Sequence, residues 1–153
     1  RCRSRSVSTW PVIAKLTPNV TDIVAIAHAV VDGGADGISM INTLLGMAVD
    51  WRSRKPVLGN VTGGLSGPAI KPVALALLWK VRQAVDVPIM GMGGIATAED
   101  ALEFLVAGAT AVQVGTSTFV EPGAAANIVA GIESHCDNAG IARVEELVGT
   151  LRV

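Results

Sequence analysis

Polar side chains stand at the ends of two short apolar runs in this chain. Lys15 is the second-last residue of the run at residues 11–16. Asn42 ends the run at residues 37–42, and Thr43 follows it. A lysine at the end of a strand supplies either a fixed positive charge for an anionic ligand or a head group that reaches back to water. Asn42 and Thr43 either hydrogen-bond a small polar ring or form a turn. These residues are candidates for ligand binding.

Three glycine-bearing segments give a second signal. Residues 63–68 have the sequence GGLSGP ahead of an expected helix, residues 91–95 have GMGGI, and residues 115–117 have GTS. Glycine lets the backbone approach a ligand closely, and N–H groups at a helix start attract anions. The dinucleotide fingerprint GxGxxG is not met, because Ala96 takes the place of its last glycine. The pattern favours a phosphate-bearing mononucleotide over NAD.

The elements that must position these residues alternate along the chain. Apolar residues at helical spacing predict helices, the first one capped by Thr21 and ended by Gly33 and Gly34. Further helices are predicted at residues 69–85, 97–107, 124–135 and 143–151. Strands are predicted at residues 11–16, 37–42, 87–92 and 110–115, and the first is expected to be buried. Residues 43–68 are expected to form a long loop with a short strand at 57–60.

Apolar strands that alternate with amphipathic helices predict an α/β fold with a parallel sheet covered by helices. The segments that begin at Pro11 and Pro88 share one order: a strand, a threonine-capped helix and a Gly-Ala pair. Four such βα units make either half of a (β/α)₈ TIM barrel or a small open sheet. In both architectures ligands bind at the carboxyl ends of the strands, so the candidate residues are expected on one face.

Composition and charge limit the classes of function. The chain has 153 residues, enough for one domain, and its net charge of −1 argues against nucleic-acid binding by bulk charge. The sequence contains no run of 18 apolar residues, so no membrane span is predicted. Two cysteines and two histidines provide neither a disulfide framework nor a histidine-rich metal site. A reducing, cytoplasmic setting is the default expectation.

The chain resembles the FMN-dependent dihydroorotate dehydrogenases over nearly its whole length. The stretch that begins with residues 89–95 and ends with Gly108 and Ala109 resembles the C-terminal signature of the family. Residues 12–19 (VIAKLTPN) resemble its FMN-lysine strand, and residues 41–43 (INT) its orotate-binding strand end. Residues 62–72 (TGGLSGPAIKP) resemble the NAD-linked branch, whose catalytic subunit pairs with an iron–sulfur flavoprotein. The resemblance corresponds to the C-terminal half of the family barrel, at residues 11–153.

The resemblance implies a role for each candidate residue. Lys15 would lie at the N1/O2 edge of the flavin, where its charge stabilises negative charge, and Ile41 would pack near the ring. Asn42 and Thr43 would hydrogen-bond the pyrimidine substrate, dihydroorotate or orotate. The phosphate of FMN would be held by glycine backbone and hydroxyl groups, namely Ser66, Gly67, Gly93, Gly94, Gly115 and Thr116. FAD, a 2Fe–2S cluster and NAD would belong to a partner subunit in a heterotetramer.

The general base of this branch is a cysteine in an Asn-x-x-Cys-Pro-Asn-like loop. Neither Cys2 nor Cys136 stands in such a motif, so no catalytic base is expected in this chain. Residues 1–10 are rich in arginine and serine and are expected to form an irregular segment. We therefore expect an incomplete half of a pyrimidine-biosynthesis enzyme, inactive alone.

Two other functions fit the same residues. The pyrimidine-reducing domain of dihydropyrimidine dehydrogenase shares the Asn-Thr strand end and a similar glycine loop. A non-catalytic half-barrel that binds flavin or phosphate, or that pairs with a second copy, is the third reading. Substrate preference separates the first two, and the oligomeric state tests the third.

Overall fold

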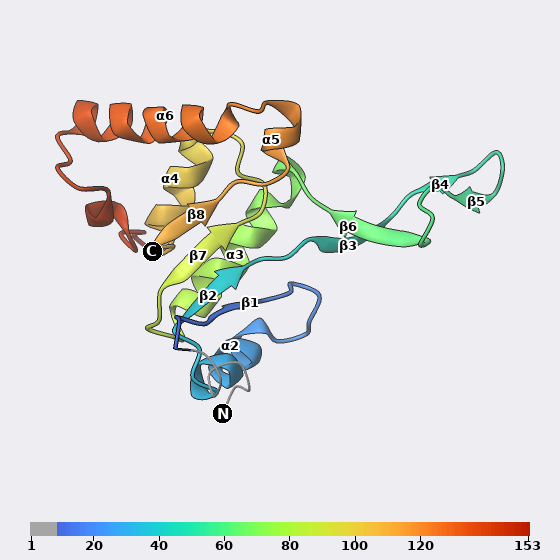
Figure 1. Cartoon of the computed structure of the whole chain (residues 1–153), viewed down its shortest axis with the longest axis horizontal. Coiled ribbons are helices and arrows are strands. Elements are labelled where there is room, and N and C mark those ends of the chain that lie inside the picture. Colours follow the sequence, from blue (N-terminus) through green and yellow to red (C-terminus); the bar gives the residue numbers. More distant parts are fainter. Residues whose placement is uncertain (1–8) are drawn as a thin grey trace.

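The computed structural model describes residues 9–153 and contains a four-stranded parallel sheet (Figure 1). The strand order is β1-β2-β7-β8, with every neighbouring pair parallel. The strands span Ile13–Lys15 (β1), Gly37–Met40 (β2), Ile89–Met92 (β7) and Ala111–Gln113 (β8). The predicted α/β class and its four parallel strands are confirmed. The described strands form an open sheet with β1 and β8 at its edges.

The helices pack beside one another and against the sheet. Helix α3 contacts β7 and lies between α2 and α4, and α4 in turn contacts α6. Their bounds are Ile23–Asp32 (α2), Lys71–Arg82 (α3), Ala98–Val106 (α4) and Ala124–Ala139 (α6), with the short α5 at Ser117–Val120. The core joins the central strands to these helices: Ile38, Ile89, Leu78 and Phe104 are fully buried. Burial of these side chains holds the layers together.

Local sequence sets most helix ends as predicted, with one correction. Gly33 caps α2, and Gly34 follows with a φ of 92°. The N-cap of α2 is Asp22, not Thr21, because the Asp22 carboxylate accepts hydrogen bonds from the Val24 and Ala25 N–H groups. Two adjacent residues of capping type made the position ambiguous. Thr97 caps α4 as predicted, in a capping box with Asp100.

Residues 43–68 are not the expected long loop. Strand β3 (Leu44–Met47) pairs with β6 (Thr62–Leu65), and β4 (Val49–Asp50) pairs with β5 (Lys55–Pro56), both antiparallel. The predicted strand at 57–60 is wrong, since these residues form the turn between β5 and β6. Gly46 stands opposite Gly63 in the β3–β6 ribbon. Because of these glycines, neither β-propensity nor alternation of apolar residues predicts strands there. The two ribbons form an arm that projects from the sheet (Figure 1).

Three further expectations need correction. Strand β1 is not buried throughout, because it lies at a sheet edge and Ile13 is 50% exposed. The predicted helix at 143–151 is only a 3₁₀ turn, Val144–Leu147, and Gly149 follows in the left-handed region with a φ of 72°. Helix α6 extends beyond residue 135 to Ala139 and ends at left-handed Gly140.

The irregular segment expected at residues 1–10 lies outside the described residues except for Thr9 and Trp10, and Cys2 lies outside them as well. Among residues 9–153, no helix has the length and apolar character needed to cross a membrane.

An ion-pair cluster joins the starts of α3 and α4. The Lys71 ammonium donates to Asp100 Oδ1 at 2.6 Å and contacts Glu103 Oε2 at 2.8 Å. Partial burial alone would raise the pKa of the Asp100 carboxyl, but hydrogen bonds from Lys71, Ala96 and Thr97 outweigh it and lower that pKa below 3.8. The same bonds to Asp100 and then Glu103 raise the pKa of Lys71 above 10.5.

The cluster makes stability depend on pH at both extremes. The Asp100 contribution is present above its unfolded pKa of 3.8 and is lost as pH falls through the lower folded value. The Lys71 contribution is present below 10.5 and is lost as pH rises through the higher folded value.

Replacement of Asp100 by asparagine should lower the free energy of unfolding at pH 7 by about 1–3 kcal/mol, because charged hydrogen bonds are lost. Urea unfolding at pH 7 and pH 3 measures it, with exposed Asp86→Asn as the control. The deficit of Asp100→Asn relative to the original chain should shrink at pH 3. An equal deficit at both values would contradict the assignment.

Candidate functional site

A cavity of about 420 Å³ opens at the carboxyl ends of the four parallel strands. Parallel pairing brings these strand ends to one edge, and the segments that follow them form the wall together with Ser66, Gly67 and Ile70, which follow β6. Every candidate residue predicted from the sequence lines this one cavity: Lys15, Ile41, Asn42, Thr43, Ser66, Gly67, Gly93, Gly94, Gly115 and Thr116. Residues that are up to a hundred positions apart in the sequence therefore meet at one site.

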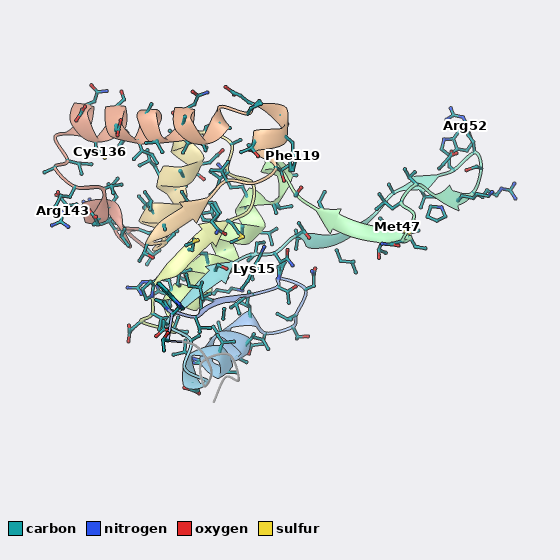
Figure 2. All side chains as sticks on the ribbon, in the orientation of Figure 1. Lys15, Met47, Arg52, Phe119, Cys136 and Arg143 are labelled. Carbon is teal, nitrogen blue, oxygen red and sulfur yellow. The ribbon has the colours of Figure 1, made fainter. Side chains whose placement is uncertain are left out.

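Lys15 is the last residue of β1 and is exposed at the cavity wall (Figure 2). It is the only lining residue among those described whose side chain carries a charge. The other members of the lining are apolar side chains, hydroxyls, amides and glycines. An uncompensated cation in such a setting favours an anionic or electron-rich ligand group.

Asn42 and Thr43 are fixed by a local hydrogen-bond network. The Thr43 N–H donates to Asn42 Oδ1 at 2.9 Å. The side-chain oxygen of Asn42 therefore stabilises a local turn, which is one of the two roles expected for this residue. Asn19 braces the segment from outside, because its amide donates to the Thr43 carbonyl at 3.0 Å and accepts from the Leu45 N–H at 2.9 Å. Both residues still line the cavity, so turn formation and ligand binding are compatible here.

The glycine segments have distinct physical reasons for lacking a side chain. Gly67, Gly93 and Gly94 have φ values of 87°, 123° and 82°, which other residues rarely adopt. A Cβ on Gly94 would also stand 2.7 Å from the Lys71 backbone nitrogen. Gly115 differs, because its φ is not positive and a Cβ there would meet no atom within 4 Å. Packing within the chain therefore does not require glycine at position 115.

Hydroxyl groups link the three segments to one another. The Thr116 hydroxyl donates to Ser66 Oγ at 2.8 Å, which joins the segment after β8 to the one after β6. The Ser117 hydroxyl donates to the Ile95 carbonyl at 2.7 Å, which joins the segment after β8 to the one after β7. These bonds hold the cavity wall in one arrangement.

Sequence reasoning missed six of the lining residues. Ile70, Met92 and Ile95 supply apolar surface, and Gln113, Val114 and Ser117 complete the wall beside Gly115. Gln113 stood two positions before Gly115, so the period of two in a strand could have placed it on the same face. Met92, Ile95 and Ser117 belong to the glycine-bearing segments at 91–95 and 115–117, but only the glycines and Thr116 of those segments were assigned a role. Ile70 and Val114 had no signal of their own, because apolar residues are usually found in the core.

The described cysteine is remote from this site. Cys136 lies on α6 and lines a different cavity, of about 620 Å³, between α6 and β8. Figure 2 shows Cys136 and Lys15 in separate parts of the molecule. Within the part of the chain that the structure describes, the cavity at the strand ends is thus lined by binding groups and one cation, but by no thiol, imidazole or carboxylate.

Comparison with known proteins agrees with the motifs. Residues 3–136 match the family model for dihydroorotate dehydrogenase. The chain is 61% identical over 147 residues to the "Dihydroorotate dehydrogenase B (NAD(+)), catalytic subunit" of Geotalea uraniireducens, covering 96% of this chain and 48% of that protein. A protein of the same name from Desulforamulus reducens is 63% identical over 145 residues, covering 95% of this chain and 48% of its own length.

The chain thus spans about half the length of the curated relatives it matches. The names of these relatives favour the dihydroorotate reading over the dihydropyrimidine dehydrogenase alternative. Because the family model covers most of the chain and the motif residues meet at one cavity, the chain belongs to the dihydroorotate dehydrogenase family.

Proposed function

We propose that this chain supplies one side of an FMN and pyrimidine site, and that the complete enzyme oxidises dihydroorotate to orotate in pyrimidine biosynthesis. The observation that carries the proposal is the meeting of Lys15, the Asn42-Thr43 pair and three glycine segments at a single cavity. Its volume of about 420 Å³ falls within the usual range for small-molecule sites.

The residues present fit FMN. Gly115 and Thr116 face Ser66 and Gly67 across the wall, where backbone and hydroxyl groups suit a phosphate. Gly115 lacks a side chain for no reason within the chain, so the close approach of a ligand is its best explanation. Ile41 and Met92 add apolar surface of the kind that a flat aromatic ring system needs.

The residues divide the work by chemistry. FMN, when bound, supplies the hydride-accepting group. Lys15 places a positive charge where negative charge develops, which lowers the barrier by fixed electrostatics rather than by proton transfer. Asn42 and Thr43 orient the pyrimidine through amide and hydroxyl hydrogen bonds, and their own turn restricts both side chains.

The proton removed from C5 of dihydroorotate needs a separate acceptor. Among residues 9–153, the polar side chains of the cavity wall are hydroxyls, amides and a lysine, and none of these hydroxyls bonds a carboxylate or an imidazole that would activate it. Because the branch that the chain resembles uses a cysteine as its general base, we infer that a cysteine outside this chain is the base. We also infer that the 153-residue chain alone does not turn over dihydroorotate.

The architecture and partners follow the same proposal. The open edges at β1 and β8 suit a sheet that continues into a (β/α)₈ barrel, and the exposed Ile13 is a residue that such a continuation would cover. The relatives are named as NAD-linked catalytic subunits. We infer an electron-transfer partner that carries FAD, a 2Fe–2S cluster and the NAD site, in a heterotetramer.

Binding to the chain should quench the fluorescence of FMN, so a fluorescence titration measures the dissociation constant. Gly115→Val should raise this constant at least about tenfold, because the valine side chain occupies the space of the ligand. Gly59→Val is the matched control, because a Cβ there also meets nothing within 4 Å but lies outside the cavity. Both variants should unfold like the original chain. FMN binding by Gly115→Val at full affinity would refute the phosphate site.

In a full-length enzyme that carries these residues, Lys15→Ala should slow flavin reduction by about 10²–10³-fold, the usual cost of losing one electrostatic stabiliser. Binding of orotate should change little. Stopped-flow absorbance measures the reduction, and Lys80→Ala on the exposed side of α3 is the control. Unchanged reduction kinetics in Lys15→Ala would contradict the electrostatic role.

A further inference from the structure

Lys71 stands behind the glycine segments without lining the cavity. Its ammonium bonds Asp100 Oδ1 at 2.6 Å and Glu103 Oε1 at 3.0 Å, so two of the three carboxylates of α4 face it. Its side chain is 25% exposed and that of Asp100 is 13% exposed. Neither residue lines the cavity, so neither would contact a ligand there directly.

Local helix chemistry does not account for this lysine. Lys71 is the first residue of α3, where the partial positive charge of the helix start disfavours a cation. The first turn of α3 contains no acidic residue, and its N-cap, Ile70, makes no side-chain bond. The carboxylates of Asp100 and Glu103 on α4 are the partners that make a lysine favourable at this position.

The cluster connects two segments of the cavity wall. The ideal Cβ position of Gly94 lies 2.7 Å from the Lys71 nitrogen and 2.9 Å from its Cα, so the Gly94 backbone rests directly on the start of α3. Asp100 Oδ2 accepts from the Ala96 and Thr97 N–H groups at 2.9 and 3.0 Å. Lys71 therefore contacts Gly94 at one point and holds Ala96 and Thr97 through Asp100 at another.

We propose that Lys71 is a positioning residue for the phosphate of the cofactor, a role that rests on the proposed function. With its two carboxylates it holds the segment Gly93–Thr97 against the helix that follows Gly67. Two glycines with positive φ give this segment a large conformational freedom in the absence of restraint. The cluster removes that freedom before the ligand arrives, so the entropy lost in ordering the segment does not weaken ligand binding.

The Ser66–Thr116 and Ser117–Ile95 bonds complete this arrangement from the cavity side. Those hydroxyls lie in the wall and would contact a phosphate, whereas Lys71 lies outside it. The wall therefore has two kinds of support. Loss of Lys71 should loosen the segment around Gly94 and leave the cation at Lys15 and the turn at Asn42 intact.

The test compares FMN with riboflavin, which lacks the phosphate, in the 153-residue chain. Lys71→Met should raise the dissociation constant for FMN about tenfold and that for riboflavin less than about twofold. Lys71→Arg should restore most of the FMN affinity, since a guanidinium reaches both carboxylates. Lys80→Met, also on α3, should change neither constant. Glu103→Gln removes the more exposed carboxylate and should give a smaller loss of the same kind, even if Lys71→Met fails to fold.

The outcomes separate the two proposals. If the original chain binds neither flavin, the proposed function fails and this inference fails with it. If the original chain binds FMN but the Lys71→Met and Glu103→Gln variants lose FMN and riboflavin affinity equally, Lys71 has only a general structural role. Unchanged FMN affinity in both variants also overturns the inference.

Discussion

Parallel pairing of four short strands is the constraint on which the rest of this structure depends. It directs every carboxyl end to the same edge of the sheet, and the chain can therefore collect Lys15, Asn42 and the glycine segments at one cavity. The strands are three or four residues long, so the helix layer must secure their alignment. Buried contacts of Ile38, Ile89 and Phe104 do so, and they fix the positions at which the segments of the wall begin.

The wall itself depends on close backbone approach. Gly94 rests on the first residue of α3, and the Lys71–Asp100 pair holds the following turn in place. Hydroxyl bonds from Thr116 and Ser117 tie the third segment to the other two. Rigid glycine segments offer backbone groups at a fixed spacing, and the proposed phosphate site relies on these groups.

Prediction from the sequence succeeded where periodicity and capping chemistry are local. The strand and helix order, the Thr97 cap and the glycine stop after α2 were all recognisable, and the residues at strand ends met as expected. The β3–β6 ribbon could not be predicted, because facing glycines at positions 46 and 63 pair through the backbone alone. The exposure of β1 depends on its place in the strand order, and no local pattern encodes that. The ion pairs of Lys71 could not be predicted either, because its partners lie on another helix.

The proposed FMN site lies at the carboxyl ends of the four strands. Titration of the isotope-labelled chain with FMN, followed residue by residue in amide NMR spectra, tests it most directly. If FMN binds there, the amide signals of Gly93, Gly94, Gly115 and Thr116 shift together and saturate with one dissociation constant. Shifts confined to the cavity between α6 and β8, around Cys136 and Val129, would contradict it, as would the absence of any saturating shift.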